Sequence, residues 1–261
     1  MLRTYRQDTT SADSDQGQRG ADGSRLGRPH LPNDIGLNRL AWDLRGEGAT
    51  TFPGMILWGA RTDGPLLPPG RYAVRVVADG ESARAPLVVR RNPWIEDVTD
   101  ADLRAQYVFA ARVRDKVSEA NEAVIAIRRV KAQLEDRIER TDDATLERLA
   151  GRLDTDLSEV EGNIYQVKNQ SNQDPLNFPI KVNNRLANLM TMAQRGDGRP
   201  TSNMPEIFRI LVDELAGYTG RLAEIWRRDL RAVNAELERL NLPPLDPKCL
   251  EETGCPVGVS D

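Results

Sequence analysis

The chain has 261 residues, of which 39% are hydrophobic and 29% charged, and its net charge is −4. This composition is typical of folded domains, and without a global positive charge the chain is not expected to bind nucleic acid or an anionic membrane surface. No apolar run reaches the roughly 18 residues that cross a bilayer, so no membrane span is predicted. The one histidine, His30, lies in a Gly/Pro-rich stretch. Histidine-based catalysis and metal sites are therefore poor candidates, and no cofactor is expected.

The pattern of residues 1–92 predicts a small β-sandwich. Residues 8–34 are rich in Asp, Ser, Gly, Gln and Thr and lack periodicity, so we expect a long mobile loop there. The stretches "GLNRLAWDLR", "GMILWGA" and "LLPPGRYAVRVVADGESARAPLVVRR" carry the signals of short strands, with Asp79-Gly80 as a tight hairpin turn. Several short strands at this spacing favour a sandwich. A strand pattern already at "LRTYRQ" leads us to expect further sequence upstream.

Residues 93–99 are predicted to link this domain to a helical one at 100–242. Thr99, followed three residues later by Asp102, is a good N-cap. Apolar residues then recur at three- and four-residue steps in four segments, which start near positions 100, 141, 182 and 202. Each segment has a narrow apolar stripe that needs partners, so an antiparallel four-helix bundle is the expected solution. Residues 243–261 are expected to form an irregular tail.

Both cysteines, Cys249 and Cys255, lie in that tail. Their spacing is not CxxC and no histidine is near, so we predict no zinc site. They could form a small disulfide loop in an oxidising compartment, or they could remain free thiols in a frayed terminus. The sequence leaves both alternatives open.

The stretch "QVKNQSNQDPLNFPIKVNN" at 166–184 is rich in side-chain amides and almost free of charge. Asp174 is expected to cap the turn that follows it, with Pro175 in the first position, and Pro179 should bend the chain again. Such a corner leaves backbone groups without helical partners, and Asn and Gln can satisfy them without a buried charge. We favour this structural role over a ligand site. The outward-facing candidates for a binding role are Asn172, Gln173 and Asn177.

Trp58 is a further candidate binding residue, because "LWGA" shows no alternation that would place it in the core. Trp42, by contrast, falls on the inward-looking face of its predicted strand, which favours core packing. Carboxylate pairs such as Asp142 and Asp143 fall at predicted helix starts, where capping explains them. No catalytic residue is therefore predicted.

Five stretches, "GLNRLAWDLR", "FPGMILWGA", "PPGRYAVRVVADG", "DKVSEANEAV" and "NQSNQDPLNFPIKVNN", together resemble the C-terminal region of secreted BNR/Asp-box β-propeller proteins. These are also described as WD40/YVTN/BNR-repeat, sortilin-like (VPS10-like) or glycosyl-hydrolase-like proteins. The resemblance covers most of residues 36–240, and the β part resembles the FlgD-type Ig-like module. In that family an N-terminal propeller carries the repeats and any proposed hydrolase chemistry. This chain has no S-x-D-x-G-x-T-W Asp box, and its β region is too short for a propeller.

The resemblance implies an exported, periplasmic or extracellular parent protein and transfers no catalytic residue. The expected fold is α+β and multidomain, an Ig-like sandwich followed by an antiparallel four-helix bundle. The expected function is a non-catalytic C-terminal structural or interaction module, which contacts an upstream β-propeller domain or another protein. One alternative is a glycan-handling hydrolase with two carboxylates, about 5–10 Å apart, between the domains. Another is a dimerising or partner-binding helical module that uses the amide corner or an exposed helix face.

Overall fold

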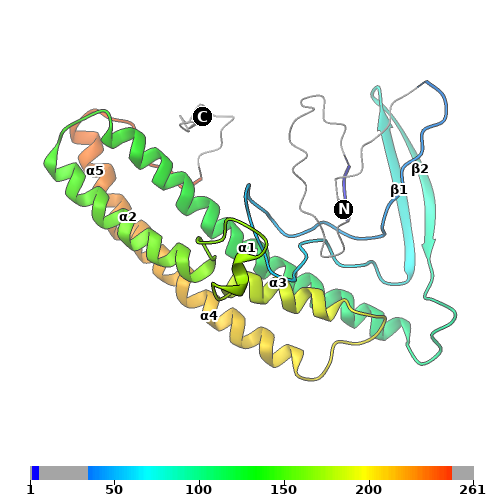
Figure 1. Ribbon diagram of the computed structural model, residues 1–261. Helices are drawn as coiled ribbons and strands as arrows, with labels where there is room; N and C mark the ends of the chain where they lie inside the picture. The colour runs from blue at the N-terminus through cyan, green and yellow to red at the C-terminus, as the bar shows by residue number, and fades with distance from the viewer. Residues whose placement is uncertain (1, 6–34, 249–261) are drawn as a thin grey trace. The chain divides into compact units, whose positions relative to one another are not determined.

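A computed structural model describes residues 2–5 and 35–248 of the chain. Their elements, in order, are β1 (Gly70–Ala78), β2 (Glu81–Val89), α1 (Asp100–Ile138), α2 (Ala144–Ile164), a 3-10 turn (Asp174–Leu176), α3 (Val182–Ala193), α4 (Met204–Ile225), a π-helical turn (Trp226–Leu230) and α5 (Arg231–Arg239) (Figure 1). The predicted combination of helices with a small antiparallel β part is confirmed. The predicted loop 8–34, His30 and both cysteines lie outside the described residues.

The chain divides into two compact units. Unit 1 comprises residues 1–49, 59–115 and 187–205, and unit 2 comprises residues 50–58, 116–186 and 206–261. The division falls inside α1 and α3, so that each of these helices contributes residues to both units. The domain boundaries expected at 92/93 and 242/243 follow sequence pattern rather than spatial contacts, and they stay a prediction.

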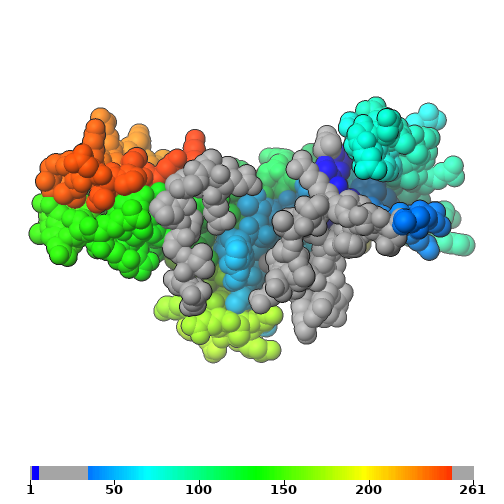
Figure 2. All heavy atoms as spheres, turned by 90° about the horizontal axis from the view of Figure 1, so that it is seen from above, coloured from blue at the N-terminus to red at the C-terminus, as the bar shows by residue number. Residues whose placement is uncertain are grey.

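Unit 2 is built from helices whose apolar stripes face inward, as the three- and four-residue spacing predicts. The stripe of α2 includes Leu146, Leu153, Leu157 and Ile164, all fully buried. Burial of a side chain of this size contributes roughly 1.5–3 kcal/mol. α2 and α5 lie side by side and run in opposite directions (Figures 1 and 2). The helical packing of unit 2 thus follows from the sequence pattern.

The last helical segment is one continuous rod with a local irregularity. The sequence predicts a single helix from about position 202 to 240, and the structure divides it into α4, the π-helical turn and α5. The π-helical turn contains Asp229, which is buried and pairs with Arg228 (2.8 Å) and Arg152 (3.3 Å). An extra residue in one turn shifts the stripe that follows it, so the turn re-aligns α5 against α2. Hydrophobic spacing alone does not reveal such a turn.

Residues 44–49 and 62–67 of unit 1 pass close together in opposite directions. Gly46 N–H donates to the Pro65 carbonyl (2.9 Å), and Ala49 N–H donates to that of Thr62 (2.8 Å). The contact is too close for a side chain between the two backbones, because a Cβ on Gly64 would clash with the Gly46 carbonyl group. In the described residues 35–66, one isolated bridge between Arg45 and Leu66 takes the place of the predicted strands.

The hairpin of β1 and β2 forms where the sequence predicts it. The turn uses Asp79 (φ 50°) and Gly80 (φ 83°), which is the pair of left-handed residues that a two-residue type I′ turn requires. The register pairs Ala78 with Glu81 next to the turn and Gly70 with Val89 at the open end. This two-stranded sheet is what the described residues contain of the predicted sandwich.

Candidate functional site

Side-chain amides hold the segment 50–58 against the helices of unit 2. The Asn184 side chain accepts from Trp58 N–H (2.7 Å) and donates to the Trp58 carbonyl (3.0 Å), as a neighbouring strand would. Buried Asn183 donates to Asn121 (3.1 Å), which in turn donates to the Thr50 carbonyl (2.7 Å). These bonds satisfy backbone groups that lack a sheet partner. This explains why "GMILWGA", predicted as a strand, lies along helices without being one.

Two further amides hold the segment after α5 in the same way. Asn234 accepts from Leu245 N–H (2.8 Å) and donates to its carbonyl (3.0 Å). Gln133 accepts from Asp246 N–H (2.9 Å) and donates to its carbonyl (3.0 Å). We call Asn184, Asn234 and Gln133 the amide clamps of unit 2. The part of the predicted irregular tail that the structure describes is thus fixed to α1 and α5.

The amide-rich corner has the structural bonds that its composition predicts, with one correction. Gln166 reaches across the corner and donates to the Pro179 carbonyl (2.9 Å). Asp174 does not cap the turn that follows it, and that prediction is wrong. Its carboxylate points toward the preceding residues and accepts from the N–H groups of Gln170 (2.6 Å) and Ser171 (2.8 Å). These two N–H groups lie beyond the end of α2 and lack a helical acceptor. These bonds lower the pKa of Asp174.

The predicted binding residues of the corner lie at the surface of unit 2. The side chains of Asn172, Gln173 and Asn177 are exposed and make no hydrogen bond to another described residue. Trp58 is 40% exposed, and its backbone is held by Asn184. The structure therefore brings Trp58 to the C-terminal end of the amide-rich stretch. A binding role for these four residues stays a prediction.

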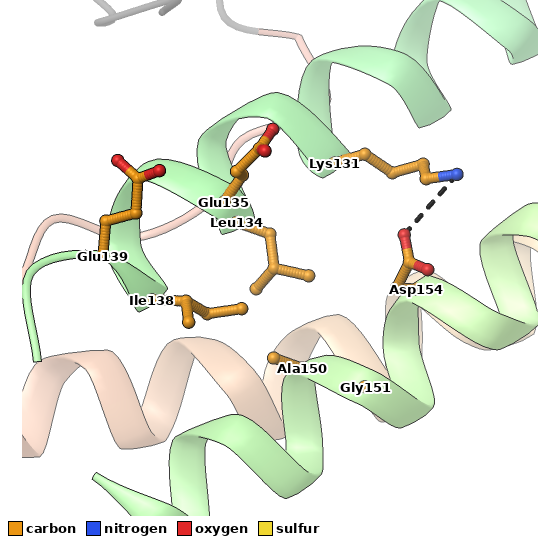
Figure 3. A pocket seen from close by; sticks show the side chains of 8 residues that line it. All are labelled: Lys131, Leu134, Glu135, Ile138, Glu139, Ala150, Gly151 and Asp154. Carbon is orange, nitrogen blue, oxygen red and sulfur yellow. Dashed lines mark ion pairs between the residues drawn. The ribbon is translucent and has the colours of Figure 1, made fainter. Parts of the chain in front are cut away.

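A hollow of about 360 Å³ opens between α1 and α2 (Figure 3). It is lined by Lys131, Leu134, Glu135, Ile138, Glu139, Ala150, Gly151 and Asp154. Lys131 reaches toward Asp154, with a nitrogen–oxygen distance of 3.5 Å. The carboxylates of Glu135 and Glu139 point away from α2, so they do not converge on the hollow. An acid–base pair needs two carboxyl groups that face one substrate, and this hollow does not provide them.

The carboxyl groups of the described residues whose pKa is lowered serve as helix and turn caps. Hydrogen bonds from Thr99, with Arg199 as a further donor, lower the pKa of Asp102 to about 2. The backbone N–H of Leu146 is the largest cause of the lowered pKa of Asp143, the N-cap of α2. A general acid at neutral pH needs the opposite shift. These groups are therefore explained by capping, as the sequence predicts for acids at helix starts.

The described residues also contain no cluster of three or more His, Cys, Asp or Glu side chains that could hold a metal ion. Among the described helices, none combines the length and the apolar character of a membrane span.

The hairpin presents two chemically different faces to solvent. We call the first its apolar face: Tyr72, Val74, Val76, Ala83, Ala85 and Leu87. Val74 is 42% and Val76 60% exposed. The second, the arginine face, carries Arg71, Arg75 and Arg84 together with Val77 and Val88, each 56% exposed. The alternation in "GRYAVRVVA" predicts the two faces, but only the structure shows that both of them are exposed.

No protein-family model matches this chain, and no similar protein was found among curated proteins or solved structures.

Proposed function

We propose that this chain is a non-catalytic structural and interaction module, in which unit 1 provides part of an Ig-like β-sandwich and unit 2 an antiparallel helical bundle. The observation that carries the proposal is the exposed apolar face of the hairpin. A two-stranded sheet is marginal by itself and needs a second layer on its apolar side. The resemblance to propeller proteins makes an upstream β-propeller domain the partner that we favour, which would place the parent protein in the periplasm or outside the cell.

Two features of unit 1 support the proposal, one for the Ig-like fold and one for the interaction role. The Tyr72 hydroxyl donates to the Pro68 carbonyl, four residues upstream, at 2.6 Å. A tyrosine that bonds back to the backbone just before its strand is typical of the corner of Ig-like sandwiches. Most of the exposed large apolar side chains in the described residues also belong to unit 1, including Trp94 at 90% exposure. Exposed apolar surface of this kind marks interaction sites.

An activity screen tests the non-catalytic part of the proposal. The purified chain is incubated with a panel of aryl glycosides and peptides, and we expect no turnover. Turnover that a single carboxylate substitution abolishes would contradict the proposal and favour the glycan-handling alternative.

A neutral fluorescent dye tests the apolar face. Nile red emission with the wild-type chain is compared with that of the double variant Val74→Thr/Val76→Thr, which we expect to lower the emission. The matched control is Val77→Thr/Val88→Thr, which places the same change on the opposite face of the same strands. Equal loss in both double variants, or no loss in either, would count against a specific apolar docking face.

A further inference from the structure

The two outer edges of the hairpin are not equivalent. In a two-residue hairpin the residues that flank the turn, here Ala78 and Glu81, form a hydrogen-bonded pair, and hydrogen-bonded pairs then alternate along the ladder. The N–H and C=O groups of positions 71, 73, 75 and 77 therefore point away from β2. On the far edge of β2, Pro86 occupies one of the outward positions and has no N–H. No described segment pairs with the outer edge of β1, which keeps every donor and acceptor, and we call it the free edge.

The arginine face carries positive charge that the described residues do not neutralise. Arg71, Arg75 and Arg84 form no ion pair with a described residue, whereas arginines of unit 2 such as Arg128 are paired with carboxylates. Arg75 lies directly opposite Arg84 in the register. Like charges in directly opposite positions destabilise a sheet. An acidic side chain beside them would remove this repulsion.

We propose that the free edge of β1 is a strand-addition site for an extended segment of a partner protein that alternates apolar and acidic side chains. Main-chain hydrogen bonds to positions 71, 73, 75 and 77 would hold such a strand, and its side chains would alternate between the two faces. Its acidic side chains would lie beside Arg71 and Arg75, and its apolar ones beside Val74 and Val76. This inference rests on the proposed interaction function and names the chemistry of the partner.

The charges favour a different protein over a second copy of the chain as the occupant. Two β1 edges paired with each other would bring Arg71 and Arg75 of both copies onto one small sheet, and basic side chains on an edge oppose such self-pairing. An acidic strand meets no such barrier. We therefore expect the chain alone to remain monomeric in sedimentation, and a dimer that Ala73→Pro disrupts would overturn the assignment of the occupant.

Peptide binding measured by fluorescence anisotropy tests the proposal. The probe is a labelled seven-residue peptide that alternates valine with glutamate, and the control peptide replaces each glutamate by lysine. We expect the glutamate peptide to bind at least tenfold more tightly than the lysine peptide. Arg75→Glu should reverse that preference. Equal binding of both peptides, or no binding of the glutamate peptide, would overturn the proposal.

Two proline variants locate the edge. Ala73→Pro removes an outward N–H from β1, and Ser82→Pro removes one from β2, so each spares the ladder between the strands. We expect at least a tenfold loss of peptide binding in Ala73→Pro and none in Ser82→Pro, with unchanged thermal unfolding in both. The reverse result would move the site to β2. Nile red binding distinguishes the two proposals, since loss of peptide binding with intact dye binding overturns only strand addition.

Discussion

At the scale of single residues, uncharged amides and capping carboxylates form the hydrogen bonds that hold irregular segments and helix starts in place. The sequence predicts that the amides of the corner satisfy backbone groups, and Gln166 does so. It does not predict the partners of Asn184, Asn234 or Gln133, because the helical pattern marks these positions only as polar. The partners of Asn184 and Gln133 are also more than 100 residues away in the sequence. The one signal for Gln133 is its position three residues after buried Val130, on the same face of α1.

Removal of the Asn184 clamp should destabilise unit 2. Asn184→Ala leaves the N–H and C=O of Trp58 without their partner, and an unsatisfied group of this kind costs about 1–3 kcal/mol. Denaturant unfolding followed by circular dichroism measures the change. The matched control is Asn172→Ala, an exposed amide whose replacement should be nearly neutral. A loss of equal size in both variants would contradict the clamp.

The carboxyl of Asp102 should give the protein acid-sensitive stability. Its pKa is about 2 in the folded chain against an ordinary value of 3.8. The stabilisation is therefore present above about pH 4 and is lost as the pH falls toward 2. Thr99 is the largest cause of the shift, so Thr99→Val should raise the pKa toward 3.8. Carboxyl ¹³C NMR titration of both proteins checks this, and an unchanged value in the variant would contradict the cause.

At the scale of elements, spacing predicts helices well and strands poorly. The apolar periodicity places helix starts near positions 100 and 182, and α1 and α3 begin at Asp100 and Val182 in the structure. The segments 38–44 and 55–59 have strand-like patterns, yet they form no strand in the structure. A helix satisfies its backbone within itself, whereas a strand needs a neighbour that local sequence cannot supply. The hairpin is the exception, because its two strands follow each other in the sequence and pair with each other.

Two glycine-to-alanine substitutions should change the stability of the chain in opposite directions, one through the close backbone contact in unit 1 and the other through helix propensity. Gly64→Ala places a methyl group against the backbone of Gly46, so we expect a loss of about 1–3 kcal/mol. Gly217→Ala changes an exposed glycine in the middle of α4, where a Cβ meets nothing within 4 Å. It should stabilise the chain by roughly 0.5–1 kcal/mol. Thermal unfolding of the two variants compares them, and shifts of the same sign would contradict the contact.

At the scale of the whole molecule, the sequence supports an architecture more than an activity. Helical spacing, together with strand alternation around the Asp79-Gly80 turn, suffices to predict a chain that combines helices with a small sheet. The candidate surface is harder to predict from the sequence. The exposure of Val76, and the lack of an ion pair for Arg75 among the described residues, depend on which other segments lie beside them. A packing pattern reports which residues can be buried, and it does not report whether a partner is present. The amide corner is held by bonds such as that of Gln166, although the Asn169 side-chain oxygen is buried without a partner among the described residues. The hairpin differs, because no described segment pairs with its outer edges.

Hydrogen exchange across the molecule should report this contrast. Amides in the buried parts of α2, such as Leu153 and Leu157, are expected to be the most protected, since they open only with their helix. The outward amides at positions 73, 75 and 77 of β1 should exchange fastest among those in strands and helices. Exchange followed by mass spectrometry or NMR measures both sets. Strong protection of the β1 edge in the isolated chain would mean that it is already covered.

The amide clamps make the fold of this protein sensitive to slow deamidation. Because they carry no charge, their hold on Trp58, Leu245 and Asp246 does not respond to salt or to ordinary changes of pH. It depends instead on the integrity of a few amide groups. Hydrolytic deamidation of Asn184 would replace its NH₂ donor by an oxygen and set two acceptors against each other at the Trp58 carbonyl. Slow chemical damage at one buried side chain would thus loosen a segment that changes of buffer leave in place.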